Sequence, residues 1–217
     1  MTPRRRVFLL KTIVWLACLT PLGWVAYRWY LGDHLTANPV EALEHWSGLS
    51  AFVILTASLA VTPVRRFTGW NDIQKVRRLT GLWAFAYAVV HFGIYLGLDQ
   101  FFGWSFILED ITERPFIISG TLALLCLLPL ALTSTRASIR RLGKNWVRLH
   151  RLVYPAAGLA LLHFLWGQKA DIRNPIIGGV VLGVLLGVRL VWWWRRRRRP
   201  PPRREPVAPE RETAAVG

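Results

Sequence analysis

Long apolar stretches alternate with short polar connections along most of this chain. Each stretch is roughly 20 residues long, which is the length that a helix needs to cross the hydrocarbon core of a membrane. The pattern therefore predicts an all-α integral membrane protein, built as a six-helix transmembrane bundle. The predicted spans are residues 7–30, 45–64, 79–98, 116–133, 146–166 and 175–194.

Basic residues are distributed unevenly among the connections between these spans. They gather before the first span, between the second and third, between the fourth and fifth, and after the sixth, whereas the other connections are mainly acidic. Because Lys and Arg are enriched on the cytoplasmic side of membrane proteins, this pattern predicts that both termini are cytoplasmic. Residues 4–6 also resemble the start of a signal peptide, but no clean cleavage site follows, which favours an uncleaved first helix.

Composition excludes several other classes of protein. The formal net charge of +16 lies in clusters between apolar spans, so we expect no nucleic-acid partner. The two cysteines, Cys18 and Cys126, lie inside predicted spans, so we expect neither a disulfide framework nor a zinc site. Residues 1–194 are expected to form one membrane domain. Residues 195–217, rich in Pro and Arg, are expected to form a disordered cytoplasmic tail that contacts anionic membrane lipid.

Two histidines, His91 and His163, lie deep inside the third and fifth predicted spans. An ionisable side chain at that depth is costly and usually has a function, and neutral imidazole is a common ligand of haem iron. At ~1.5 Å per residue, the two lie ~18 Å and ~24 Å from the inner ends of their spans. This similar depth predicts that they are the axial ligands of one haem iron. The alternative is that each is a buried histidine bonded to a neighbouring helix.

Four other residues are weaker candidates for a site. His150 lies ~20 Å before His163 along a straight helix, so it is a possible inner or alternate haem ligand. His45 opens the second span and is a candidate to contact an iron ligand rather than the iron itself. Arg77 and Arg78, at the inner end of the third span, could clamp a flavin phosphate or a haem propionate, because Arg binds such groups in a bidentate manner. The alternative is that both arginines only fix topology and anchor the chain in lipid.

Familiar catalytic motifs are absent from the sequence. No glycine-rich dinucleotide fingerprint follows a strand, and neither a Ser-His-Asp set nor an HExxH motif stands out. If the chain moves electrons, its donor and acceptor must therefore be separate molecules. The alternatives are a cytochrome that serves another acceptor and a haem-free anchor or transporter. Transporters commonly contain internal repeats, and we expect none here.

Several blocks of sequence are similar to the MsrQ family (formerly YedZ), the haem-binding membrane subunits of bacterial methionine sulfoxide reductase systems. The similarity extends from the first predicted span to the sixth and does not cover the tail after residue 194. The matching blocks are residues 38–48, 77–83 leading to His91, 111–115, 132–135, 142–150, 153–154 and 163–166.

This resemblance implies a ferric-reductase-like membrane domain that carries haem b, with FMN also associated. It implies a bacterial inner-membrane protein that takes electrons from the quinone pool or a cytoplasmic flavin reductase. The acceptor would be a periplasmic molybdopterin subunit (MsrP-like), which reduces methionine sulfoxide in oxidised periplasmic proteins. The family's haem-associated histidines fall on His91, His150 and His163. The substrate chemistry would then lie in the partner, and this chain would be an electron-transfer subunit.

Overall fold

The computed structural model describes residues 2–31, 36–168 and 172–198, and all of the regular secondary structure in these ranges is helical. The prediction of an all-α fold is confirmed. Most of the predicted tail lies outside the described residues. The α-helices are α1 (Pro3–Tyr30), α2 (Pro39–Thr68), α3 (Arg77–Ile94), α4 (Trp104–Glu113), α5 (Pro115–Leu132), α6 (Arg136–Leu142), α7 (Lys144–Leu149), α8 (Val153–Gly167) and α9 (Arg173–Arg197).

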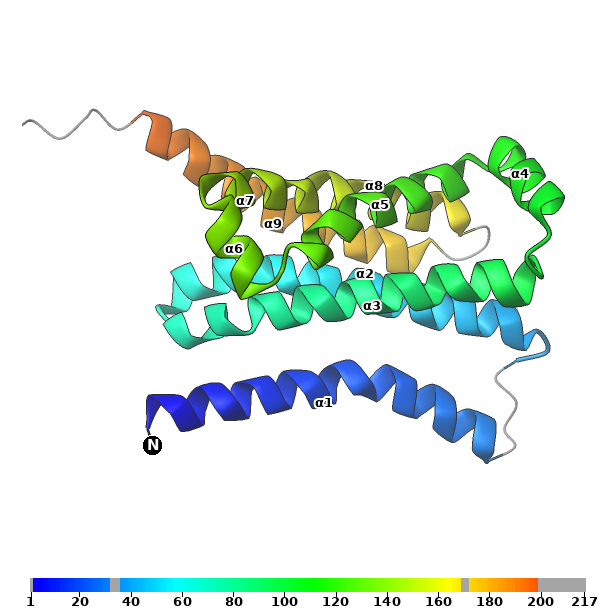
Figure 1. Cartoon of the computed structure of the whole chain (residues 1–217), viewed down its shortest axis with the longest axis horizontal. Coiled ribbons are helices and arrows are strands. Elements are labelled where there is room, and N and C mark those ends of the chain that lie inside the picture. The colour runs from blue at the N-terminus through cyan, green and yellow to red at the C-terminus, as the bar shows by residue number, and fades with distance from the viewer. Residues whose placement is uncertain (1, 32–35, 169–171, 199–217) are drawn as a thin grey trace, which may run out of the picture.

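The long helices lie side by side in a bundle, and the chain passes back and forth along it (Figure 1). Helix α2 packs against α3 and α5 against α8, while α1 contacts α2 and α3. We call the end of the bundle that carries His91 and His163 the histidine end, and the opposite end, where Arg77 begins α3, the arginine end. Helix α1 begins and α9 ends at the arginine end, whereas α4 lies at the histidine end (Figure 1).

Within the part of the chain that the structure describes, five helices are long and apolar enough to cross a membrane. Large apolar side chains on their outer surfaces are exposed, for example Leu16 at 62% and Val180 at 61%, as expected of surfaces that face lipid. These observations support the prediction of a membrane bundle in which each long helix is a separate span. The five helices are Pro3–Tyr30, Pro39–Thr68, Arg77–Asp99, Pro115–Leu132 and Arg173–Arg197.

The predicted span over residues 146–166 is not one continuous helix. Helix α7 ends at Leu149, a 3₁₀ turn covers His150–Leu152, and α8 follows. Pro155 explains the interruption, because its ring has no N–H to donate and clashes with the carbonyl four residues earlier, at Arg151. The 15 residues of α8 extend only ~22 Å, less than the ~30 Å hydrocarbon core. Five of the six predicted spans are thus long helices, and within the described chain the remaining one is a succession of α7, the 3₁₀ turn and α8.

Two helix boundaries also differ from the predicted spans. Helix α2 begins at Pro39, because the Asn38 side chain accepts a hydrogen bond from the backbone N–H of Glu41 and a proline is favoured in the first turn. His45 consequently lies in the second turn of α2 rather than at its start. At the other end of the chain, α9 continues to Arg197, so the first residues of the predicted tail are helical.

Candidate functional site

The imidazole rings of His91 and His163 lie next to each other at the histidine end of the bundle. His91 comes from the last turn of α3 and His163 from the last part of α8, and their ring centroids are 5.9 Å apart at an interplanar angle of 74°. The folded chain therefore brings together two residues that are 72 positions apart in sequence.

A backbone carbonyl of the neighbouring helix orients each ring. Nδ1 of His91 lies 3.0 Å from the carbonyl oxygen of Glu44 on α2, and Nδ1 of His163 lies 2.8 Å from that of Phe116 on α5. A carbonyl oxygen can only accept a hydrogen bond, so in each neutral ring Nδ1 must carry the proton and donate it. The other ring nitrogen, Nε2, keeps its lone pair and can bind a metal ion.

Glycine residues make the close approach of both rings possible. A Cβ atom at Gly48 would lie 3.0 Å from Cε1 of His91, and one at Gly120 would lie 2.7 Å from Nδ1 of His163. Any other residue at either position would push against the imidazole, because such distances are shorter than ordinary van der Waals contact. Because Gly48 on α2 and Gly120 on α5 have no side chain, they leave room for the imidazole rings of His91 and His163.

Both histidines line one cavity of about 840 Å³, within the range of volumes that cofactors occupy. Its inner part is apolar and its mouth, at the histidine end, is polar. A prosthetic group with an apolar body and polar edges would match this division. The apolar lining includes Phe52, Leu55, Leu124, Leu127 and Phe164, and the polar lining includes Asn38, Glu41, Glu44, Asp99, Arg114 and Gln168.

The other two candidate histidines occupy different surroundings. His45 lines the mouth of the cavity, and its Nδ1 lies 3.3 Å from the side-chain nitrogen of Gln168. His150 does not line the cavity. Its ring stacks on Trp146 with centroids 3.8 Å apart, and its Nδ1 lies 3.1 Å from the Trp146 carbonyl oxygen. The buried Nε2 of His150 has no hydrogen-bond partner among the residues that the structure describes.

Arg77 and Arg78 lie at the arginine end, and neither lines the cavity. Arg77 is half-buried and Arg78 is exposed. Consecutive residues of an α-helix point ~100° apart, so the two guanidinium groups leave α3 in different directions.

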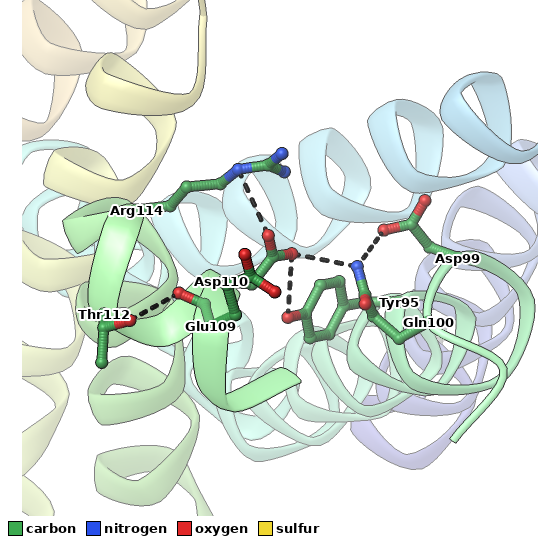
Figure 2. A network of polar contacts seen from close by, with 7 residues as sticks. All are labelled: Tyr95, Asp99, Gln100, Glu109, Asp110, Thr112 and Arg114. Atoms are coloured by element: carbon green, nitrogen blue, oxygen red, sulfur yellow. Dashed lines mark hydrogen bonds and ion pairs between the residues drawn. The ribbon is translucent and has the colours of Figure 1, made fainter. Parts of the chain in front are cut away.

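Sequence reasoning missed Arg114, which lies at the cavity mouth at the start of α5. Its Nε is 3.3 Å from Oδ1 of Asp110, the last acidic residue but one of α4 (Figure 2). The other oxygen of Asp110 accepts hydrogen bonds from the Gln100 amide at 2.9 Å and the Tyr95 hydroxyl at 3.4 Å. Asp110 therefore joins the end of α3, helix α4 and the cavity mouth.

We expect Asp110→Asn to loosen this junction. The substitution removes the negative charge that holds Arg114, and hydrogen bonds to charged groups contribute about 1.5–3 kcal/mol each. Thermal unfolding in detergent should therefore occur at a lower temperature for Asp110→Asn than for the parent protein. Glu109→Gln is the matched control, because Glu109 is exposed on the same helix and the substitution removes the same charge. Equal unfolding temperatures for the two variants would contradict the assignment.

Comparison with known proteins agrees with a membrane bundle. Residues 45–161 match the family described as "Ferric reductase like transmembrane component", so the chain is a multi-pass membrane protein of the ferric-reductase-like class. No solved structure gives a significant match.

Three relatives define the family within this class, and all are named "Protein-methionine-sulfoxide reductase heme-binding subunit MsrQ". The protein of Rhodospirillum rubrum is 51% identical over 83% of this chain and 87% of its own. The protein of Xanthomonas axonopodis pv. citri is 48% identical over 84% of this chain and 85% of its own. The protein of Herminiimonas arsenicoxydans is 43% identical over 85% of this chain and 85% of its own. The chain therefore belongs to the MsrQ family, as the resemblance predicted.

Proposed function

We propose that this chain binds haem b through His91 and His163 and serves as the electron-transfer subunit of a methionine sulfoxide reductase. The observation that carries the proposal is the pair of imidazoles whose Nδ1 atoms are held by carbonyls and whose centroids are 5.9 Å apart. Two imidazoles that each bind one iron at ~2 Å have centroids roughly 6 Å apart, so the separation of this pair supports His91 and His163 as the residues that would hold a haem iron. The relatives' printed name, which includes heme binding, supports the same group.

When bound, haem supplies an iron that gains and loses one electron. The chain's own residues would hold the group and exclude water from it. The apolar inner lining, which includes Phe52 and Leu127, suits the macrocycle, and the guanidinium of Arg114 at the mouth suits a propionate carboxylate. His45 would contribute to the polar mouth of the cavity, where it contacts Gln168, and would not bind the iron.

The direction of electron flow follows from the predicted topology. We propose that the arginine end, with its basic connections and both ends of the described chain, faces the cytoplasm of a bacterium, and that the protein lies in the inner membrane. Electrons from a quinone or a cytoplasmic flavin reductase would enter at this end. They would leave at the histidine end for a periplasmic molybdopterin subunit (MsrP-like), which carries out the sulfoxide chemistry.

Participation of FMN is a separate part of this proposal. The relatives' names mention heme and no flavin, so FMN rests on the resemblance alone. A flavin phosphate would meet suitable positive charge at the arginine end, where the partly buried Arg77 interacts electrostatically with Arg189. His150, at the same end, has its Nε2 available, so an inner haem or a quinone remains an alternative occupant.

A visible spectrum of the purified chain tests the proposal. We expect a reduced-minus-oxidised spectrum of b-type haem, with the amount fixed by pyridine haemochrome, and re-oxidation of the reduced protein by an MsrP-like partner with methionine sulfoxide. Haem that is re-oxidised by ferric chelates but not by that partner would favour a ferric-reductase-like cytochrome. A folded protein that takes up no haem when haem is supplied would overturn the proposal and favour an anchor or transporter.

A further inference from the structure

The two histidines are held by contacts that repeat each other. The hydrogen bond between Glu44 and His91 joins residues 47 apart in sequence, and so does the bond between Phe116 and His163. In both cases the accepting carbonyl lies near the start of one helix and the histidine near the end of the antiparallel helix packed against it. The hairpin α2–α3 and the hairpin α5–α8 thus present a histidine in the same way.

The same two residue types follow each accepting carbonyl. Three residues after Glu44 comes Ser47, and three after Phe116 comes Ser119; a glycine follows each serine. Ser119 donates to the Phe116 carbonyl at 2.8 Å. Ser47 lies 3.1 Å from the Glu44 carbonyl oxygen and 2.7 Å from that of Leu43, so its hydroxyl is shared between the two, and both serines are buried. We call each unit of carbonyl, serine and glycine a histidine seat.

A shift of 72 residues superimposes one hairpin on the other in the sequence. Nine positions are then identical, although the rest of the two segments differs. In six of these pairs both members line the same cavity. The identical pairs are Glu41 and Glu113, Ser47 and Ser119, Gly48 and Gly120, Ala51 and Ala123, Leu55 and Leu127, Ala84 and Ala156, Ala88 and Ala160, His91 and His163, and Phe92 and Phe164.

We propose that the cavity is formed by two copies of one helical hairpin, and that the two seats are positioning elements that fix the tautomer and orientation of the axial imidazoles. The inference rests on the haem ligation proposed above. Helix α3 packs on α5 and α2 on α8, as an approximate two-fold relation between the hairpins requires. The proposed repeat departs from the expectation, drawn from the sequence, of no internal repeat. Since α2 and α5 run in the same direction, it is not the inverted repeat of many transporters (Figure 1).

The serine hydroxyl has a defined effect in this arrangement. A carbonyl that already accepts a hydrogen bond from Ser119 is a weaker acceptor for the N–H of His163. Without that hydroxyl the imidazole N–H would bond more strongly, the ring would become a better electron donor to iron, and the oxidised state would be favoured. Ser119→Ala should therefore lower the midpoint potential, and Ser119→Thr, which keeps a hydroxyl, should restore it.

Glycine substitutions in the full-length protein test both seats. Gly120→Ala should weaken haem binding roughly ten-fold or more, the size of effect that outer-shell changes produce at metal sites, and should change the electron paramagnetic resonance spectrum of the ferric haem. Gly48→Ala should have a smaller effect, because its Cβ would lie 3.0 Å from the ring rather than 2.7 Å. Gly93→Ala and Gly158→Ala are the controls, since a Cβ at either position meets nothing within 4 Å.

The outcomes separate this inference from the function on which it rests. A parent protein without haem would overturn the proposed function. A parent with haem, whose Gly48→Ala and Gly120→Ala variants match the controls in haem affinity and resonance spectrum, would overturn the seats alone. If the glycine variants do not fold, the potentials of Ser119→Ala and Ser119→Thr decide: a lowered and restored potential supports the seats, and an unchanged potential in Ser119→Ala overturns them.

Discussion

His91→Ala and His163→Ala should each abolish haem binding at the histidine end and leave the protein inserted in the membrane. A bis-histidine site that loses one imidazole loses half of its axial ligation. The other imidazole keeps its position, because it is bonded to a carbonyl of its own hairpin and not to the histidine that was removed. We expect the haem-to-protein ratio of either variant to fall essentially to that of a haem-free preparation. Pyridine haemochrome analysis of the purified variants, with protein quantified separately, measures this.

Two further histidines supply the controls. His45→Ala should retain haem, because His45 contacts Gln168 at the mouth of the cavity. His150→Ala should retain the haem of the histidine end, because His150 stacks on Trp146 outside the cavity. A normal haem content in His91→Ala or in His163→Ala would remove that residue from the ligand set. Loss of part of the haem in His150→Ala would instead assign His150 to a second haem at the arginine end.

Hydropathy was sufficient to predict the long helices but not their interruptions. The length of each apolar stretch decides whether a helix can span a membrane, and this property is visible in the sequence. The segment over residues 146–166 has a suitable composition, yet Pro155 removes one helical hydrogen bond and divides it into α7, a 3₁₀ turn and α8. Helix α2, in contrast, extends beyond its apolar stretch to Pro39, because a cap at Asn38 stabilises its polar first turns.

The residues around the histidines were harder to predict than the histidines themselves. His91 and His163 are conspicuous because an ionisable group in an apolar helix is rare. Their hydrogen-bond acceptors are backbone carbonyls, which no residue type reveals, and Gly48 and Gly120 matter only because a ring of another helix lies against them. The one signal in the sequence was the common shift of 72 residues between the two hairpins, and its identities are too sparse to recognise without the contacts.

Arg77 and Arg78 illustrate a different limit. Adjacent arginines suggest a joint anion site when only the sequence is read, but helical geometry directs neighbouring side chains ~100° apart. Arg77 is half-buried near Arg189, which donates a hydrogen bond to the Tyr154 hydroxyl at 2.8 Å. The arginine end therefore contains a partly buried group of charges whose members come from α3 and α9, and no single stretch of sequence contains both.

Ala84→Leu and Ala156→Leu should both destabilise the bundle, and by similar amounts. These alanines occupy equivalent positions of the two hairpins and are 1% and 0% exposed within the main apolar core. Small residues at such positions allow neighbouring helices to approach closely, and the larger side chain of leucine must displace them. Overpacking of this kind costs about 1–3 kcal/mol. The temperature at which each variant unfolds and releases haem in detergent should therefore fall.

Ala86→Leu provides the matched comparison, because Ala86 lies two residues from Ala84 on α3 and is exposed. Its added methyl groups would extend away from the core, so its unfolding temperature should remain close to that of the parent. If Ala84→Leu lowers the unfolding temperature while Ala156→Leu does not, the two hairpins are not packed equivalently, although each could still hold its histidine. If both behave like Ala86→Leu, the close packing of α2 with α3 and of α5 with α8 does not limit stability, and the cavity must tolerate wider spacing between its walls.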